Sequence, residues 1–478
     1  MHKISEEFQR HTDGLRTFFD NFAPRRGLWR EKNITYYREL EREYRFIIPQ
    51  GSRVLELGCA TGDLLAAVEP SLGLGVDLSP EMIRLAREKF PHLRFECGCA
   101  EDFATGGETF DVIILSDLLA YSYDILGLFM AIRPLCHERT RIVINYYSRL
   151  WQPLYGLLEA LGRKADLPIH NWVTTDDVNN FLALAGYEVV HHAPRIMLPV
   201  GIPLVSEIIN RFASRLPVLG SFCFTNFLVA RLPAPLQDKK PSVSVVCPCR
   251  NEAGNIPEIV RRLPDMGAAT ELIFVEGHST DDTHSQCLAA RDKHPEKDIS
   301  VLRQTGKGKA DAVHLGFSRA KGDVLMILDA DMTVPPEDLP VFYETLVSGR
   351  AEFVNGSRLV YTMEKKAMRF LNLLGNKFFS LAFSYLLEQP IKDTLCGTKV
   401  FTRQDYQRIM ETRRYFGEFD PFGDFELLFG AAKLKLLIRD LPVRYRERTY
   451  GTTQISRFRH GLILLRMSVV ALARLRFH

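Results

Sequence analysis

Val324-Leu325-Met326-Ile327-Leu328-Asp329-Ala330-Asp331 is the stretch of this sequence that decides its fold. An apolar run with the length of a buried strand ends in two carboxylates separated by one residue. The exposed end of that strand would carry Asp329 and Asp331 together, where both can bind one divalent cation. Mg²⁺ and Mn²⁺ prefer carboxylate oxygens together with phosphate oxygens, so the pattern predicts a metal clamp for a diphosphate.

Two more apolar runs upstream also end in polar loops. Residues 243–247 run into Pro248-Cys249-Arg250-Asn251-Glu252, and residues 271–275 run into Glu276 and a loop rich in Ser, Thr and Asp. Gly306-Lys307-Gly308-Lys309 lies between these loops and the two aspartates. Strands that each end in such a loop are typical of an open α/β sheet, which binds ligands at the carboxyl ends of its strands. Without them, a solvated turn would be the simpler interpretation of Asp-x-Asp.

From about Pro241 to the C-terminus, these ordered motifs resemble the GT-A-fold inverting glycosyltransferases of family 2, in the dolichol-phosphate-mannose-synthase-like branch. The resemblance implies transfer of a sugar from a GDP- or UDP-sugar to a polyprenyl phosphate or a related lipid-linked acceptor. The nucleotide-sugar contacts that it implies are Pro248, Glu252, Glu276, Lys309 and Arg448. The Mg²⁺ or Mn²⁺ ligands that it implies are Asp329, Asp331 and Thr333.

Some positions depart from that family's pattern and leave the donor open. Glu276 and Gly277 stand where relatives often show two Asp residues, and Thr333 stands where Gln is usual. Asn355-Gly356-Ser357-Arg358 resembles the family's Gly-Ser/Thr-Arg element, which implies that Arg358 lies near the acceptor. A hydroxyl acceptor would require a general base, whereas a phosphate acceptor is already an anion. The sequence offers two candidate bases and does not choose between them, Asp424 and Glu426.

Two further segments extend the resemblance. Residues 393–399 are similar to the family's Asp-x-x-x-Gly loop before the acceptor region. Arg444, Arg446 and Arg448 alternate before Tyr450, and a similar segment of relatives closes over the diphosphate. The planar guanidinium pairs bidentately with phosphate oxygens, so we expect phosphate contact there. An edge strand with a solvated basic face is the alternative, because alternation is also typical of exposed strands.

The N-terminal half carries a second, unrelated pattern. Residues 51–62 are a strand that enters a glycine-bearing turn before a helix, and the next strand ends at Asp77. Such a turn with an acid after the second strand is the ribose-binding arrangement of doubly wound folds. Residues 37–232 resemble the class I S-adenosylmethionine-dependent methyltransferases. The cofactor contacts that this resemblance implies are Glu56, Gly58, Gly62, Asp77 and Asp102.

Methylation of a hydroxyl on a glycan or lipid-linked acceptor is the activity expected of this half. Ala60 stands where that family usually has glycine, and a positive φ there would strain the turn. Ser116 and Asp117 would flank the site of methyl transfer. A non-catalytic module that binds S-adenosylmethionine is the alternative, because fold does not imply activity. The candidate catalytic residues are Tyr121, Tyr146, Asn171 and His170, the last as a base or as a packing residue.

The 478 residues exceed one hydrophobic core and predict an α/β protein of two domains. We expect a Rossmann-like methyltransferase domain at 1–232 with a helical lead-in over 1–48, a linker at 233–241, and a GT-A fold with C-terminal amphipathic helices at 242–478. A net charge of +3 argues against nucleic acid as a partner. Nine cysteines without zinc or disulfide spacing, and no secretory signal in 1–30, predict a cytoplasmic protein.

Two apolar segments predict contact with the cytoplasmic face of a membrane. Residues 370–387 combine an apolar face with a polar stripe at i,i+4 spacing, and residues 458–477 are apolar with four arginines. Both suit the membrane interface, and neither is an uninterrupted spanning run. Packing of these helices within the protein is the alternative, and it would accompany a soluble or protein acceptor.

Overall fold

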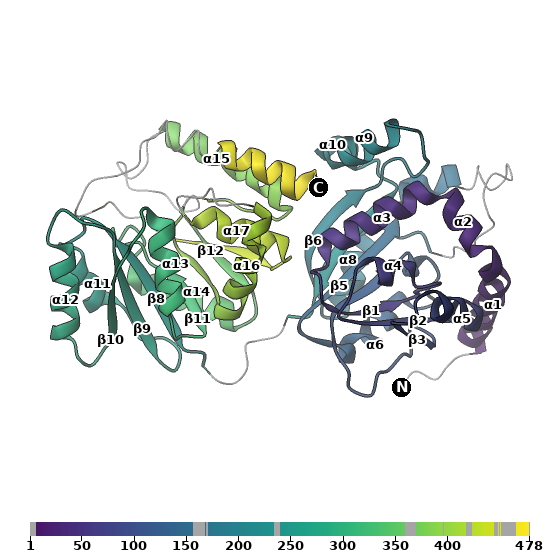
Figure 1. Ribbon diagram of the computed structural model, residues 1–478, viewed down its shortest axis with the longest axis horizontal. Helices are drawn as coiled ribbons and strands as arrows, with labels where there is room; N and C mark the ends of the chain where they lie inside the picture. Colours follow the sequence, from purple (N-terminus) through teal and green to yellow (C-terminus); the bar gives the residue numbers. More distant parts are fainter. Residues whose placement is uncertain are drawn as a thin grey trace. The chain divides into compact units, whose positions relative to one another are not determined.

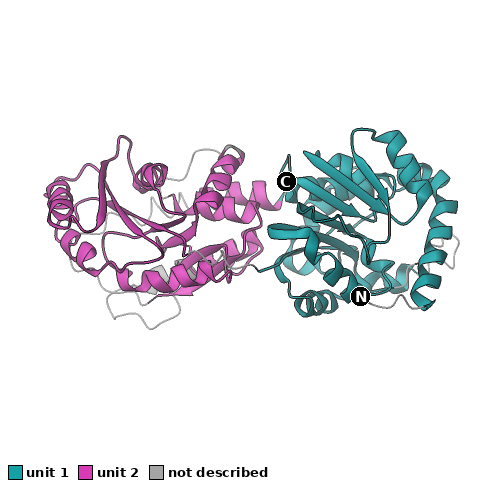
Figure 2. Cartoon of the chain, turned by 90° about the horizontal axis from the view of Figure 1, so that it is seen from below, with its two compact units in different colours: residues 1–233, 477–478 teal, residues 234–476 magenta. Residues whose placement is uncertain are grey.

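The computed structural model describes residues 6–155, 168, 171–233, 240–358, 370–394, 396–416, 423–443, 448, 450 and 465–477. His170, Arg444, Arg446 and the segment 451–464 lie outside the described residues. The chain divides into two compact units (Figure 2). Unit 1 comprises Met1–Pro233 with Phe477–His478, and unit 2 comprises Ala234–Arg476.

Unit 1 is built on a seven-stranded sheet with the order β3-β2-β1-β4-β5-β7-β6 (Figure 1). The strands β3 to β5 in that order run parallel, whereas β7 is antiparallel to both β5 and β6. Chain order reverses between β1 and β4, so a ligand crevice is expected at their carboxyl ends. The strands are β1 Arg53–Leu57, β2 Leu72–Asp77, β3 Arg94–Cys97, β4 Phe110–Ser116, β5 Cys136–Tyr147, β6 Glu188–Arg195 and β7 Thr225–Arg231.

Three N-terminal helices form the helical lead-in. Helix α3 buries Tyr36, Leu40, Tyr44 and Ile47 at helical spacing, which gives it one apolar face that joins the core of the sheet. Other helices alternate with the strands, and a segment between β6 and β7 carries two short ones. The helices of unit 1 are α1 Glu6–Phe22, α2 Arg26–Lys32, α3 Ile34–Ile47, α4 Asp63–Ala67, α5 Pro80–Lys89, α6 Ile125–Ala131, α8 Thr175–Leu184, α9 Val205–Arg211 and α10 Pro217–Gly220.

Unit 2 contains a second seven-stranded sheet, with the order β10-β9-β8-β11-β13-β12-β14. The first four strands run parallel, β13 is antiparallel to β11 and β12, and β14 is parallel to β12. The protein is therefore an α/β protein of two units with two mixed sheets, as the sequence predicts. The strands are β8 Val243–Cys249, β9 Thr270–Glu276, β10 Asp298–Arg303, β11 Val324–Ile327, β12 Phe353–Ser357, β13 Lys399–Thr402 and β14 Ile438–Pro442.

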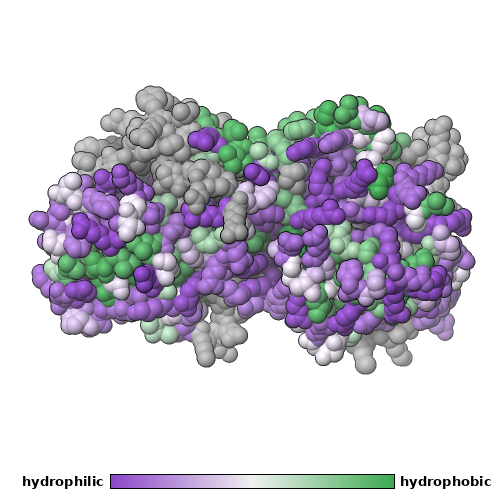
Figure 3. Space-filling model, in the orientation of Figure 1, coloured by the Kyte–Doolittle hydropathy of each residue, from purple (hydrophilic) through white to green (hydrophobic). Residues whose placement is uncertain are grey.

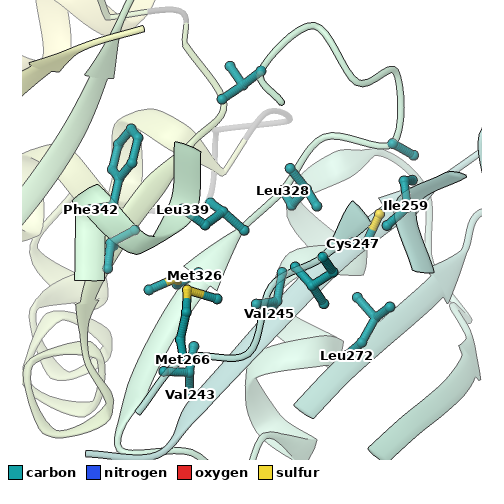
Figure 4. Close-up of a cluster of buried hydrophobic side chains, with 14 of the residues drawn as sticks. Val243, Val245, Cys247, Ile259, Met266, Leu272, Met326, Leu328, Leu339 and Phe342 are labelled. Carbon is teal, nitrogen blue, oxygen red and sulfur yellow. The ribbon is translucent and has the colours of Figure 1, made fainter. Parts of the chain in front are cut away.

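Helices pack on both faces of the central strands of unit 2, which explains why β8 and β11 are continuous apolar runs. On one face, Val243, Val245 and Met326 pack against side chains of helices α11 and α14 (Figure 4). On the other face, Gly316 of α13 lies against Val246. The helices of unit 2 are α11 Ile256–Arg262, α12 Thr283–Lys293, α13 Lys309–Arg319, α14 Leu339–Val347, α15 Phe370–Leu387, α16 Arg403–Phe416 and α17 Asp424–Lys433, followed by the π-helical turn η7 Leu472–Arg476.

The two segments predicted to contact a membrane pack partly within unit 2. On α15, the hydroxyls of Ser380 and Ser384 donate to the carbonyl of Ile391 at 2.7 and 2.9 Å, and Phe383 is fully buried. The polar stripe thus faces the protein at these positions. Arg476 is buried in an ion pair with Glu388. Within the described part of the chain, no helix is long and apolar enough to cross a bilayer.

Candidate functional sites

A cavity of about 390 Å³ lies at the carboxyl ends of the parallel strands of unit 1. The strand ends contribute Gly58 and Ala60 after β1, Asp77 at the end of β2, and Asp117 after β4. Helices α1, α2 and α3 also line the cavity, with aromatic side chains among charged and aliphatic ones; the aromatic residues are Phe19, Phe22, Trp29, Tyr36 and Tyr37. The cavity therefore coincides with the crevice that the sheet topology predicts.

The turn after β1 has the backbone shape that the sequence suggests. Gly58 and Gly62 adopt φ values of +77° and +74°, a region that favours glycine. Ala60 also has a positive φ, of +46°, so the turn is strained at the position where the resemblance expects glycine. The amide of Ala60 donates to Asp77 Oδ2 at 2.8 Å, and Asp77 Oδ1 accepts the amide of Ser79 at 2.9 Å. Asp77 therefore holds the turn in place.

Glu56 offers a polar group that protein contacts leave open. The residue is 2% exposed and contributes to the wall of the cavity, and burial raises its pKa well above the usual range. Its Oε2 atom has no hydrogen-bond partner among the described residues. A buried carboxyl oxygen facing a cavity is costly unless a ligand completes it. With the glycine turn and Asp77, it gives the cavity the hydrogen-bonding groups that fit a nucleoside such as the adenosyl group of S-adenosylmethionine.

The acid expected after β3 is displaced by one residue. Asp102 is exposed and does not line the cavity, whereas Glu101 does. Glu101 Oε1 accepts the hydroxyl of Ser122 at 2.8 Å and the amide of Tyr123 at 3.1 Å, and these bonds turn its side chain inward. The structure thus assigns Glu101 the place at the cavity that the sequence analysis gave to Asp102.

Asp117 is the most constrained acid on the cavity wall. It has a φ of +55°, and its carboxyl accepts the hydroxyls of Tyr36 and Tyr147 at 2.8 and 3.0 Å and the Asn145 amide at 2.5 Å. Burial raises its pKa to about 6, against the lowering effect of these hydrogen bonds. A carboxylate has about four acceptor positions, so three donors leave one for a ligand. Such strain is often found at functional sites.

The candidate catalytic residues of unit 1 have different surroundings. Tyr121 lines the cavity. Tyr146 does not, because it projects from the other face of β5 and donates to the hydroxyl of Thr175 at 3.0 Å. The side chain of Asn171 donates to the carbonyls of Leu119 and Ser122. These bonds stabilise the turn after Asp117 and leave the amide nitrogen directed at the protein. Tyr36 and Tyr147 are not among the site residues that the sequence predicts. Tyr36 belongs to the aromatic residues of the lead-in helices, which could have indicated this wall, whereas Tyr147 ends β5.

In unit 2, the carboxylates after β11 are paired with cationic side chains. Lys309, the first residue of α13, places its Nζ 2.7 Å from Asp329 Oδ1 and 3.6 Å from Asp424 Oδ2. Burial alone would raise the pKa of Asp329, but the Lys309 charge holds it below the usual range. Asp424 therefore belongs to the same cluster as the Asp-x-Asp motif.

Arg448 connects the loops after β8 and β11. Its guanidinium lies 2.5 Å from Asp331 Oδ2 and 3.4 Å from Glu252 Oε1. The hydroxyl of Thr333 donates to Asp331 Oδ1 at 2.8 Å. Burial raises the pKa of Glu252 to about 7, with the nearby Asp331 charge acting in the same direction and Arg448 against it. The motif residues Glu252, Asp331, Thr333 and Arg448 thus form one cluster.

Two glycines allow chain segments to approach this cluster closely. A Cβ on Gly397 would lie 2.0 Å from Asp329 Oδ2 and 2.4 Å from Lys309 Nζ. A Cβ on Gly254 would lie 2.6 Å from the ring of Tyr450. A Cβ at either position would require these side chains to move, so the chain at Gly397 approaches Asp329 closely and the chain at Gly254 approaches Tyr450 closely.

Other predicted residues are engaged elsewhere in unit 2. Glu276 is 0% exposed and accepts the amide of Ser279 at 2.5 Å. Its Oε2 atom lies 3.3 Å from the guanidinium of Arg303 in β10 and has no hydrogen-bond partner among the described residues. Pro248 lies in β8 and is partly exposed near the strand end. Arg358 forms a bidentate pair with the buried Asp393, at 2.7 and 2.9 Å. Arg358 therefore supports the 393–397 loop in this structure.

The structure separates the two candidate bases of unit 2. Glu426 pairs with His314 at 3.2 Å and with Arg413 at 2.6 Å, whereas Asp424 faces Lys309. Residues two apart on a helix point in nearly opposite directions. Asp424 lies with the Asp-x-Asp cluster, and Glu426 lies in a separate polar cluster between α13, α16 and α17.

The carboxylates of Asp329 and Asp331, with the hydroxyl of Thr333, form an oxygen donor set for a hard divalent cation. No group of three or more His, Cys, Asp or Glu residues that could hold a metal is found among the residues that the structure describes. Mg²⁺ commonly binds through one or two carboxylates and completes its shell with water and substrate phosphates. The residues present therefore fit a cation that is shared with a diphosphate.

Comparison with known families divides the chain in the same way. Residues 29–192 match the model of a methyltransferase domain, and residues 244–410 match that of glycosyl transferase family 2. Among curated relatives, the undecaprenyl-phosphate 4-deoxy-4-formamido-L-arabinose transferase of Sodalis glossinidius is 32% identical over 224 residues, which are 46% of this chain and 64% of the relative. The dolichol-phosphate mannosyltransferase of Pyrococcus furiosus is 36% identical over 121 residues, 25% of this chain and 33% of the relative.

Solved structures also resemble each half. A glucosyl-3-phosphoglycerate synthase from Mycobacterium tuberculosis matches with a TM-score of 0.37 and 19% identity, over 49% of this chain and 80% of its own. An S-adenosylmethionine-dependent methyltransferase from Mesorhizobium loti matches with a TM-score of 0.32 and 20% identity, over 40% of this chain and 96% of its own.

The two family matches and the curated relatives place the protein in the transferase class, with one transferase domain in each unit. The chain is a fusion of a methyltransferase domain with a glycosyltransferase family 2 domain, and the latter is related to polyprenyl-phosphate sugar transferases. The resemblances drawn from the sequence are thereby confirmed. The family domains imply S-adenosylmethionine and a nucleotide sugar as the small molecules that the chain uses. The chain spans less than two thirds of the length of both curated relatives, 64% and 33%.

Proposed function

We propose that unit 2 transfers a sugar from a GDP- or UDP-sugar, with inversion, to a polyprenyl phosphate or a related lipid-linked acceptor. The observation that carries this proposal is the cluster in which Lys309 pairs with Asp329 and Arg448 pairs with Asp331. Two carboxylates and two cations meet at the ligand-binding edge of the sheet. The relatives named after undecaprenyl phosphate and dolichol phosphate support the class of acceptor.

Side chains of unit 2 can bind the cation and neutralise the charge on the leaving diphosphate. A Mg²⁺ or Mn²⁺ held by Asp329 and Asp331, with Thr333 beside them, would neutralise charge on the leaving diphosphate. Arg448 is placed to move from Asp331 to a phosphate oxygen, for which its fork is suited. Lys309 balances the charge of Asp329 and Asp424. A phosphate acceptor needs no base, and Asp424 would serve as the base for a hydroxyl acceptor.

The test is release of the nucleoside diphosphate from a panel of GDP- and UDP-sugars, with undecaprenyl phosphate and Mn²⁺ or Mg²⁺. We expect release with one donor that depends on the lipid. Asp329→Asn and Asp331→Asn should each lower the rate about 100-fold or more, the usual effect of losing one charge-stabilising group. Asp323→Asn is the matched control, because Asp323 bonds Ser242 at the other end of β11. Release that ignores the lipid would refute the acceptor class.

For unit 1 we propose methylation of a hydroxyl on a glycan or lipid-linked acceptor. S-adenosylmethionine would supply the activated methyl group. Glu56, Asp77 and Glu101 are placed to hold the cofactor against the turn of Gly58 and Gly62. Asp117 is placed to accept the proton of the acceptor hydroxyl, because a carboxyl with a pKa of about 6 is ionised at neutral pH and still basic enough to act.

Calorimetry with S-adenosylmethionine and S-adenosylhomocysteine tests cofactor binding, and absence of binding to both would leave a docking module. Methyl transfer to the lipid-linked product of unit 2 then tests the reaction. Two adjacent tyrosines form a matched pair, since Tyr147→Phe removes a donor to Asp117 and Tyr146→Phe removes a donor to Thr175. We expect only the first to slow methyl transfer. Equal effects would refute the assignment of Asp117.

A further inference from the structure

Large hydrophobic side chains are exposed in two neighbouring segments of unit 1, residues 150–154 and 200–222. More than half of the large hydrophobic side chains that are exposed in the described residues lie in these segments. The most exposed are Leu204 at 77% and Val218 at 74%. Figure 3 shows hydrophobic residues gathered over α9 and α10. We refer to these two segments as the apolar face.

Helix α9 on this face has its polar and apolar sides reversed relative to an ordinary surface helix. Val205 and Ile208 are exposed, whereas Ser206 and Asn210 are buried. Ser206 accepts the amide of Ile202 at 2.8 Å and donates to the carbonyl of Val200 at 2.6 Å. A water-facing helix would gain nothing from this arrangement, so the outward side is suited to apolar surroundings.

The backbone and charges of the segment are satisfied on the inner side. Asn210 bonds both the amide and the carbonyl of Leu198, at 2.8 and 2.9 Å. Arg215 is buried and pairs with Glu43 of α3. Unpaired backbone groups are costly in a low-dielectric medium, and here side chains of the segment itself satisfy them. Leu204, the N-cap residue before α9, has a φ of +63°, a strained conformation for an exposed leucine.

The apolar face continues into the cavity of unit 1. Leu154 and Val200 belong both to the face and to the wall of the cavity. A smaller hollow of about 180 Å³ is lined by Leu150, Trp151, Leu154 and Phe222. A molecule held at the apolar face would therefore stand at the entrance of the candidate methyltransferase site.

Charge distinguishes a lipid surface from a protein partner. Glu207 is the only acid between residues 200 and 222. Arg149, next to Leu150, is exposed, whereas Arg211 is half-buried and donates to the carbonyl of Phe477 at 3.2 Å. Basic side chains around an apolar patch complement anionic headgroups. A protein interface normally carries about one hydrogen bond per 100–200 Å², but Ser206 and Asn210 point inward and offer a partner none.

We propose that the apolar face of residues 150–154 and 200–222 inserts into the interface of an anionic lipid bilayer and holds unit 1 with its cavity beside the membrane. This surface differs from the two segments of unit 2 that the sequence indicated. The proposal does not depend on either proposed reaction, because binding to vesicles needs no substrate.

The test is sedimentation of the full chain with vesicles of equal parts phosphatidylglycerol and phosphatidylcholine, combined with hydrogen exchange. The variant carries Leu204→Gln, Ile208→Gln and Val218→Gln, all at exposed positions that leave the core intact. The control carries Leu28→Gln, Met130→Gln and Leu184→Gln, which are exposed to a similar degree elsewhere on unit 1. We expect the variant to bind vesicles about tenfold more weakly or worse, and the control to bind as the parent does.

Hydrogen exchange locates the contact. We expect vesicles to slow exchange in residues 198–222 of the parent chain. The proposal is overturned if the parent does not sediment with vesicles, or if the variant binds as tightly as the parent. It is also overturned if protection of 198–222 follows protein concentration without lipid, which would indicate a second copy of the chain on this face.

Discussion

Substitution of Gly62 by alanine adds one methyl group but should lower both the stability of unit 1 and its affinity for the cofactor. Gly62 has a φ of +74°, and a Cβ there would lie 2.6 Å from Cζ of Phe95. The ring of Phe95 cannot easily move away, because the chain at Gly75 already lies close to it: a Cβ on Gly75 would lie 2.7 Å from the same ring. Phe95 is therefore wedged between two glycines, and the new methyl group must displace the turn itself.

The expected loss has two parts. Alanine in the left-handed region costs about 1–2 kcal/mol, and overpacking of a buried site costs about 1–3 kcal/mol. The sum of about 2–5 kcal/mol corresponds to a fall in the melting temperature of roughly 4–20 °C for a unit of this size. The same displacement moves Ala60 away from Asp77, so the affinity for S-adenosylhomocysteine should fall about tenfold or more.

Scanning calorimetry of the full chain measures this effect. The transition of unit 1 is the one whose melting temperature rises when S-adenosylhomocysteine is added. Ala60→Gly is the reciprocal control, because it relieves strain at φ +46°. It should leave the free energy of unfolding of unit 1 unchanged or raise it by up to about 1 kcal/mol. An unchanged transition in Gly62→Ala, or a lowered one in Ala60→Gly, would refute this reasoning.

Three further substitutions test the sites. Asp77→Asn should weaken binding of S-adenosylhomocysteine by about 1.5–3 kcal/mol in calorimetry, because a charged acceptor of two backbone amides is lost. Unchanged affinity would contradict the assignment of Asp77 to the cofactor site. Gly397→Ala should lower Mn²⁺-dependent release of the nucleoside diphosphate about 100-fold, because the added methyl group displaces Asp329. Binding of S-adenosylhomocysteine to unit 1 should stay unchanged. A release rate equal to that of the parent would contradict the steric argument. Burial raises the pKa of Asp117, so methyl transfer should increase as pH rises through about 6. Asp117→Asn should remove that increase, and a profile identical to that of the parent would exclude Asp117 as the base.

Apolar runs that end in polar loops predict the central parallel strands of both sheets. Strand β11 lies between parallel β8 and antiparallel β13, and a strand buried on both faces has to be apolar throughout. The residues after such strands meet at one edge, which is why Glu252, Asp329 and Asp331 could be grouped from sequence alone. The antiparallel strands β12 and β13 carry no such signal. The motif at 355–358 indicates an arginine near the acceptor and the motif at 393–399 indicates a loop, and neither has the pattern of a buried strand.

Spacing in the sequence is least informative where one residue decides the direction of a side chain. Asp102 and Glu101 are adjacent acids after a short strand, and the hydroxyl of Ser122, a partner 21 residues away, turns Glu101 inward. Glu276 is buried, with one oxygen bonded to the amide of Ser279 and the other facing Arg303 of β10. Spacing along the chain does not specify such choices, because they depend on contacts between segments that are distant in sequence.

Helices α9 and α15 show why amphipathic patterns locate an interface poorly. On both, serines that would be placed on the water side instead bond a loop of their own unit, Ser206 with residues 200–202 and Ser384 with Ile391. Outward positions are then left to apolar residues, Ile208 on α9 and Leu381 on α15. A periodic polar stripe shows that a helix has two sides, but hydrogen bonding of the neighbouring loop decides which side faces outward. For that reason the surface of α9, which the sequence did not single out, carries the stronger argument for contact with lipid.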